Sequence, residues 1–169
     1  MLCGIAPRKI PTGWLAGFRH LRPSGVTPGV TSATELEKAW GAPREVRKHQ
    51  GLLIHRYTVK PFDQIEVMFD GETVGSIVIR LNKAFPAKAV AEQLQMADIR
   101  PVFVSNELGD ILGQAFPERG VLFAFEQNHE PGQPSMKVTE IVVEPVGADP
   151  FILRAETNLD SDYASNLRD

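Results

Sequence analysis

Residues 29–43 read GVTSATELEKAWGAP, and this stretch decides how the rest of the chain is expected to fold. Ser32 and Glu35 have the spacing of a capping box, which marks the start of a helix. Gly41 suits the left-handed residue that follows a helix, and Pro43 cannot continue one. The expected helix carries one apolar stripe, made of Leu36, Ala39 and Trp40. We expect this stripe, with Trp40 at its end, to pack against a sheet.

Three strand-like runs follow the helix, because the apolar period changes to two. They are Leu53 to Val59, Ile65 to Phe69 and Val74 to Leu81, with Asp70-Gly71 as the turn between the last two. The basic stretch from Arg44 to His49 reads as a solvated loop. One amphipathic helix before an antiparallel meander predicts the α+β fold class, with short helices packed on a meander sheet.

The second half of the chain, residues 85–146, has a similar order of elements. A helix that starts at Pro86 has one apolar face, and turn residues dominate 105–120. Further strands are expected at 102–104, 121–125 and 138–143. The two halves share element order and not residue identity, so two tandem helix-plus-meander units are one interpretation of the chain.

The last residues, 147–169, return to helical spacing. Asp149-Pro150 is a typical helix start, and Asp160-Ser161 interrupts the apolar pattern with a polar break. The pattern resumes with Tyr163 and Leu167 at positions i and i+4. We therefore expect a C-terminal helical hairpin.

The first helix and its strands resemble the BamE/SmpA type of small bacterial envelope lipoprotein. The motifs that carry this resemblance are Gly29-Val30-Thr31, Trp40-Gly41-Ala42-Pro43 and the hairpin from Ile65 to Gly71. The β-lactamase inhibitor protein, which is two such units in tandem, is similar. The resemblance implies a location in the bacterial envelope or periplasm. It also allows a stand-alone protein inhibitor or an envelope-assembly factor that binds through its exposed sheet face.

Residues 147–169 resemble the opening of a tetratricopeptide repeat, a helix–turn–helix unit of about 34 residues. Such units need neighbouring repeats for stability, so the resemblance implies a segment of a longer array. Without those neighbours, its helices would present an apolar surface. We therefore expect self-association through the C-terminal helices.

The 169 residues divide into four expected segments. These are a basic, disordered leader at 1–28, a first helix-plus-meander unit at 29–84, a second, looser unit at 85–146 and a truncated helical-repeat segment at 147–169. Trp14-Leu15-Ala16-Gly17 has the form of the end of a lipoprotein signal, but Phe18 stands where the lipidated cysteine would be. We expect no lipid anchor and no membrane span, since no run reaches about 20 apolar residues.

Composition and motifs argue against several classes of function. The net charge is −3 with mixed signs, so the chain as a whole has no footprint for nucleic acid. The single cysteine, Cys3, allows no intrachain disulfide and no thiolate metal cluster. The patterns of zinc proteases, phosphate-binding loops and serine hydrolases do not occur. We therefore expect no enzyme, no cofactor and no metal site.

The sequence favours a non-enzymatic protein-interaction module of a repeat-containing protein. The alternative is the stand-alone inhibitor or envelope-assembly factor that the resemblance allows. The candidate partner-binding residues are His55, Tyr57, Tyr163 and Leu167. His55 alternates with Tyr57 on one strand, and the other two lie on the expected C-terminal helix.

Overall fold

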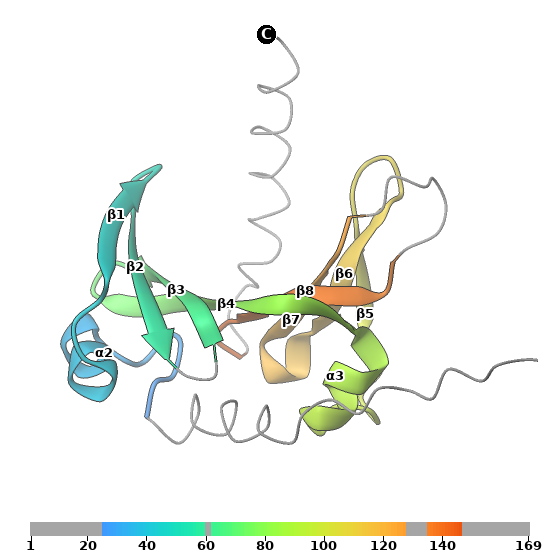
Figure 1. Cartoon of the computed structure of the whole chain (residues 1–169), viewed down its shortest axis with the longest axis horizontal. Helices are drawn as coiled ribbons and strands as arrows, with labels where there is room; N and C mark the ends of the chain where they lie inside the picture. The colour runs from blue at the N-terminus through green and yellow to red at the C-terminus, as the bar shows by residue number, and fades with distance from the viewer. Residues whose placement is uncertain (1–24, 60–61, 128–134, 147–169) are drawn as a thin grey trace, which may run out of the picture.

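The computed structural model describes residues 25–59, 62–127 and 135–146 (Figure 1). Its elements in chain order are α2 (Ala33–Trp40), β1 (Glu45–His49), β2 (Leu52–Val59), β3 (Phe62–Asp70), β4 (Thr73–Pro86), α3 (Ala87–Gln93), β5 (Val102–Ser105), β6 (Ile111–Phe116), the 3-10 turn η1 (Pro117–Arg119), β7 (Val121–Phe125) and β8 (Lys137–Val143). The strands form one antiparallel sheet in the order β1-β2-β3-β4-β8-β7-β6-β5.

Helix α2 begins and ends where its sequence signals lie. The capping box is present, since the Ser32 hydroxyl accepts from the Glu35 N–H and the Glu35 carboxylate accepts from the Ser32 N–H. Gly41 follows the helix with a φ of 82°. Leu36 is fully buried, and Trp40 packs on the sheet with its ring 5.5 Å from the ring of Tyr57 in an edge-to-face contact. The expectation that Leu36 and Trp40 pack on the sheet is confirmed, whereas Ala39 of the same stripe is exposed.

Strand β4 joins the two halves of the chain into one sheet. It runs for 14 residues and pairs with β3 on one side and β8 on the other. At the centre of the sheet, Ile79 lies opposite Ile65 of β3 and opposite Ile141 of β8. The long central strand therefore makes the two meanders continuous.

The expected α+β fold class is wrong. A single eight-stranded sheet dominates the described residues, with two short α-helices, and the expected C-terminal helical hairpin is not among them. Residues 147–169, on which the tetratricopeptide resemblance rests, lie outside the described residues, so that resemblance stays a prediction. Two strands were also missed: the basic stretch at 44–49 contains β1, and the turn-rich stretch at 105–120 contains β6.

The two faces of the sheet differ in what covers them. Both α2 and α3 lie on the same side of the sheet, which we call the helix-side face (Figure 1). Its buried side chains form the hydrophobic core and include Tyr57, Ile65, Val67, Ile79, Phe123 and Ile141. The opposite side, the helix-free face, carries the residues that alternate with these along each strand.

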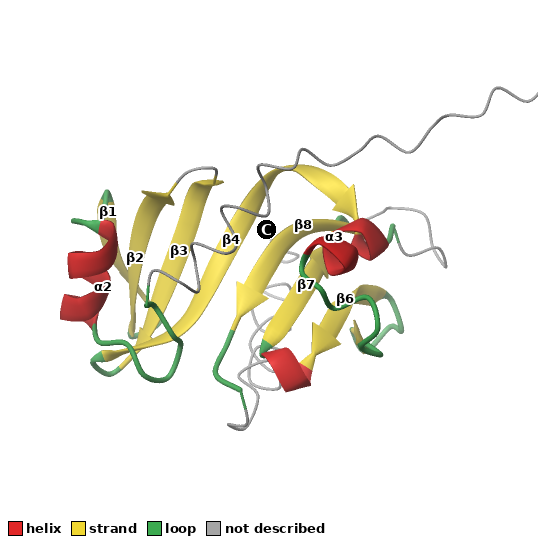
Figure 2. Cartoon of the chain, turned by 90° about the horizontal axis from the view of Figure 1, so that it is seen from below, coloured by secondary structure: helices red, strands yellow, loops and turns green. Residues whose placement is uncertain are grey.

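The two helices lie at opposite ends of the helix-side face (Figure 2). Helix α2 packs near β2, and α3 lies beside the end of β4 and β8. The centre of the sheet, at β3, β4 and β8, lies between the two helices. Neither helix, among the residues that the structure describes, is long and apolar enough to cross a membrane.

Candidate functional site

A row of paired charges crosses the helix-free face, and we call it the charge ladder. It consists of Glu45, Arg47, Arg56, Glu66, Arg80 and Glu140. The register of the strands produces it, because Arg56 lies opposite Glu45 on one side and Glu66 on the other, and Arg80 lies opposite Glu140. Five neighbouring strands thus contribute side chains to one row.

Glu66 is the centre of the charge ladder. Its Oε1 accepts from Arg47 Nη2 at 3.0 Å and from Arg56 Nη2 at 2.9 Å. Its Oε2 lies 4.0 Å from Arg80 Nη2. The Gln64 amide nitrogen also donates to Oε1 at 3.3 Å. One carboxylate therefore holds three guanidinium groups from three strands.

The ladder buries its central carboxylate and leaves its arginines accessible. The side chain of Glu66 is 9% exposed, whereas those of Arg47 and Arg80 are 42% and 48% exposed. Burial alone would raise the pKa of Glu66, but the hydrogen bond from Arg56 and the charges of Arg47 and Arg80 outweigh it. The net effect lowers the pKa of Glu66 below its ordinary value, so the group is ionised at neutral pH.

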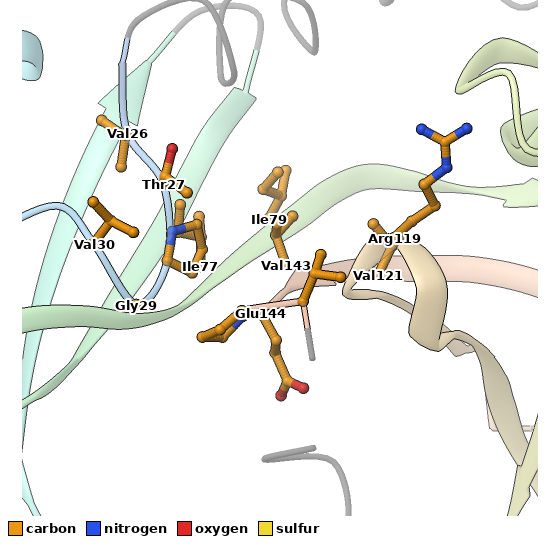
Figure 3. Close-up of a pocket in the computed structure, with 13 residues that line it drawn as sticks. Val26, Thr27, Gly29, Val30, Ile77, Ile79, Arg119, Val121, Val143 and Glu144 are labelled. Atoms are coloured by element: carbon orange, nitrogen blue, oxygen red, sulfur yellow. The ribbon is translucent and has the colours of Figure 1, made fainter. Parts of the chain in front are cut away.

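The helix-side face has a groove of about 640 Å³ between residues 26–30 and Arg119 of η1 (Figure 3). Ile77, Ile79, Val121 and Val143 from the strands line it, so its floor is apolar. Figure 3 shows Val26 and Thr27 on one side of Ile79 and Arg119 on the other. A cavity of this size is in the range that holds a compact ligand or several large side chains.

Two of the sequence-predicted site residues lie on the helix-side face. Tyr57 is only 2% exposed, and its burial, with a smaller contribution from Glu37, raises the pKa of the phenol to about 12. His55 is half-buried, with its ring 4.6 Å from that of Phe69 and its Nδ1 3.4 Å from the Tyr57 hydroxyl. Burial lowers the pKa of His55, which favours the neutral imidazole.

The contact of His55 and Tyr57 with a partner stays a prediction. The structure brings these two together at α2 and does not bring them near the charge ladder, which lies on the other face. The other two predicted residues, Tyr163 and Leu167, lie outside the described residues. In the described part of the chain, no group of three or more His, Cys, Asp or Glu residues could hold a metal ion.

Sequence reasoning missed the charge ladder. Arg47 belongs to the stretch that was expected to be a solvated loop. The signal that could have found it is the alternation itself: Arg56, Glu66, Arg80 and Glu140 each stand next to a core residue on a strand, and so point to the opposite face. Their pairing depends on the register between strands, which a single sequence does not display.

No family model and no curated protein matches this chain. Among solved structures, it is similar to a DUF4309 family protein (YjgB) from Bacillus subtilis subsp. subtilis str. 168, with a TM-score of 0.50 and 9% sequence identity. The match covers 79% of this chain and 97% of that chain. At this level of identity, the similarity concerns the fold alone.

Proposed function

We propose that this chain is a non-enzymatic protein-interaction module that binds an acidic segment of a partner protein on its helix-free face. The observation that carries the proposal is the convergence of three accessible arginines on one buried carboxylate, Glu66. Arginine is enriched among the residues that dominate binding at protein interfaces. Its planar group presents five N–H donors that match a carboxylate.

The ladder as a whole is neutral, because its three arginines are matched by Glu45, Glu66 and Glu140. Arg56 and Arg80 each contact two of these carboxylates, whereas Arg47 contacts Glu66 alone among them. Arg47 contacts Glu66 through a single nitrogen, Nη2. A carboxylate of a partner can therefore bind the other N–H groups of Arg47 without displacing Glu66.

Apolar side chains beside the ladder supply contact area. Val78, Val142 and Leu122 lie opposite one another on β4, β8 and β7 and are half-buried. They form a short apolar row on the helix-free face, next to Arg80 and Glu140. A polar cluster beside an apolar row is the composition of a typical protein-binding surface.

The test uses the full chain as bait against a library of random peptides displayed on phage. We expect the selected peptides to be rich in Asp and Glu, and to bind more weakly as salt is added. The Arg47→Gln variant should lower the affinity of those peptides roughly tenfold, since a charge-assisted hydrogen bond contributes about 1.5–3 kcal/mol.

Lys48→Gln is the matched control. Lys48 is the next residue on β1, carries the same charge and points to the other face, because it lies opposite Leu53 rather than Ile54. It should leave peptide binding unchanged. Peptides without acidic residues, or equal losses in the two variants, would contradict the proposal. The melting temperatures of both variants show whether a loss of binding is a loss of fold.

A further inference from the structure

We propose that strand β5, at one edge of the sheet, is the surface through which this chain pairs with a second copy of itself. The two β5 strands lie antiparallel in this dimer and join the two sheets into one. The proposal goes beyond the function above, because it concerns the edge of the sheet and not its helix-free face. Self-association was expected through the C-terminal helices, which, like most of the leader expected at 1–28, lie outside the described residues. Strand β5 lies within them.

The two edges of the sheet differ in charge. Strands β1 and β5 lie at its opposite ends, and among the described residues each pairs with a neighbour on one side only (Figure 1). Strand β1 carries the exposed charges of Glu45, Arg47 and Lys48, whereas β5 (Val102–Ser105) has no charged residue. Charged side chains protect an edge from pairing with another chain, and an exposed edge without them is a template for such pairing. The β5 edge is therefore the one that is open to a second strand.

Strand β5 exposes both backbone groups and apolar side chains. Alternate residues of an edge strand turn their N–H and C=O groups away from the one partner strand, which here is β6. The side chains of Val102 and Phe103 are 57% and 51% exposed, and that of Leu108, in the turn after the strand, is 87% exposed. These are three of the six large apolar side chains that are exposed in the described part of the chain. A strand added at this edge would pair the backbone groups and cover part of this apolar surface.

The charges on either side of β5 favour a second copy as the occupant, in the antiparallel direction. Exposed Arg100 precedes the strand, and exposed Glu107 follows it. When Phe103 lies opposite Phe103 of the second copy, Arg100 lies opposite Asn106 of that copy and next to its Glu107. The two-fold symmetry repeats this contact, so opposite charges meet at both ends of the joined strands. Parallel pairing would instead bring like charges together, which is unfavourable.

The test is analytical ultracentrifugation of the full chain at concentrations up to roughly 1 mM, where even weak association is populated. We expect a reversible and weak dimer, since interfaces below about 1,200 Å² are typically transient. Phe103→Lys should weaken the dimer about tenfold, because two lysines then lie opposite each other. Val46→Lys is the matched control, since Val46 is 55% exposed on the other edge strand, and it should leave the dimer unchanged. A chain that is monomeric at every concentration, or equal effects of the two variants, would overturn the proposal.

A cross-link tests the pairing independently of any effect of the lysine on folding. In a Cys3→Ser background, Phe103→Cys introduces the only thiol of the chain. Directly opposite residues of an antiparallel pair have Cβ atoms about 4.5–5.5 Å apart, close to the separation that a disulfide needs. Mild oxidation should therefore link two copies several-fold faster for Phe103→Cys than for Val46→Cys in the same background. Equal rates would mean that the copies meet elsewhere or only by random collision, and would overturn the proposal.

Discussion

Along β3, Ile65 and Val67 face the helices, and Glu66 between them faces away, toward three arginines. All three residues are buried, yet they are held by different forces. Burial of the two apolar residues depends on area removed from water and has little directional preference. The carboxylate is stable in its position only because specific donors surround it.

The two faces therefore differ in role: the helix-side face stabilises the fold, and the helix-free face carries the proposed binding site. On the helix-side face, any substitution that changes the volume of a buried side chain should lower stability, since protein interiors are densely packed. The helix-free face responds instead to changes in charge, salt and pH. A surface that depends on paired charges can exchange one partner for another, which suits the binding function proposed for it.

The largest expected effect concerns the core. Phe123 is fully buried on the helix-side face, with its ring 5.0 Å from that of Phe116. Phe123→Ala should lower the free energy of unfolding by about 3–5 kcal/mol. Leu122→Ala, the adjacent half-buried residue on the helix-free face, should cost about 1–2 kcal/mol. Urea unfolding measures both, and equal losses would remove the contrast between the faces.

The second effect breaks the charge ladder at its centre. Glu66→Gln keeps the shape of the side chain but leaves three guanidinium groups around a neutral amide. Removal of one partner from a fully buried ion pair costs about 3–5 kcal/mol, and from an exposed pair less than about 1. Because the arginines are half-exposed, we expect a loss of about 1–2 kcal/mol in urea unfolding. A loss below about 0.5 kcal/mol would show that the charge ladder does not stabilise the fold.

Local signals along the chain were enough to predict much of the sheet. The capping box of α2, the Asp70-Gly71 turn and the alternation in β2, β3, β4, β7 and β8 all depend on residues close in sequence. Strand β1 was missed because all five of its residues are exposed, so it has no apolar alternation. It is a strand because β2 offers it an edge with which to pair, and that is a tertiary effect.

Strand β6 was missed for a different reason. Gly113 was interpreted as a turn residue, but it lies within the strand, where a Cβ would collide with the backbone carbonyl of Phe123. Glycine here permits a close approach of two strands. The charge ladder and the joining of the two meanders through β4 depend on strand register, and neither could be predicted from apolar periods alone.

The buried carboxylate of Glu66 on the helix-free face also predicts that the stability of the chain depends on pH. The pKa of Glu66 is lower in the folded chain than its ordinary value of 4.5. Between these two values the unfolded chain binds more protons, so stability rises with pH. The contribution of Glu66 is therefore complete above its unfolded pKa and is lost as the pH falls through its folded pKa. The stability difference between the parent and Glu66→Gln should narrow below about pH 4.5, and a constant difference from pH 6 to pH 3, roughly the range over which carboxyl groups titrate, would contradict the assignment.

The smallest effect is expected at the end of the charge ladder, where the ion pair is exposed to solvent. Glu45 accepts from Arg56 Nη1 at 2.7 Å, but its side chain is 47% exposed and water competes for the same contact. Exposed pairs of this kind contribute about 0.2–1 kcal/mol, so Glu45→Gln should cost no more than about 0.5 kcal/mol. The screening length is about 3 Å in 1 M salt, so this small cost should vanish there in urea unfolding. The cost of Glu66→Gln should persist in the same salt, because Glu66 is shielded from solvent. If both costs vanish together, the centre of the ladder is as hydrated as its end, and the arginines would not be held in place for a partner.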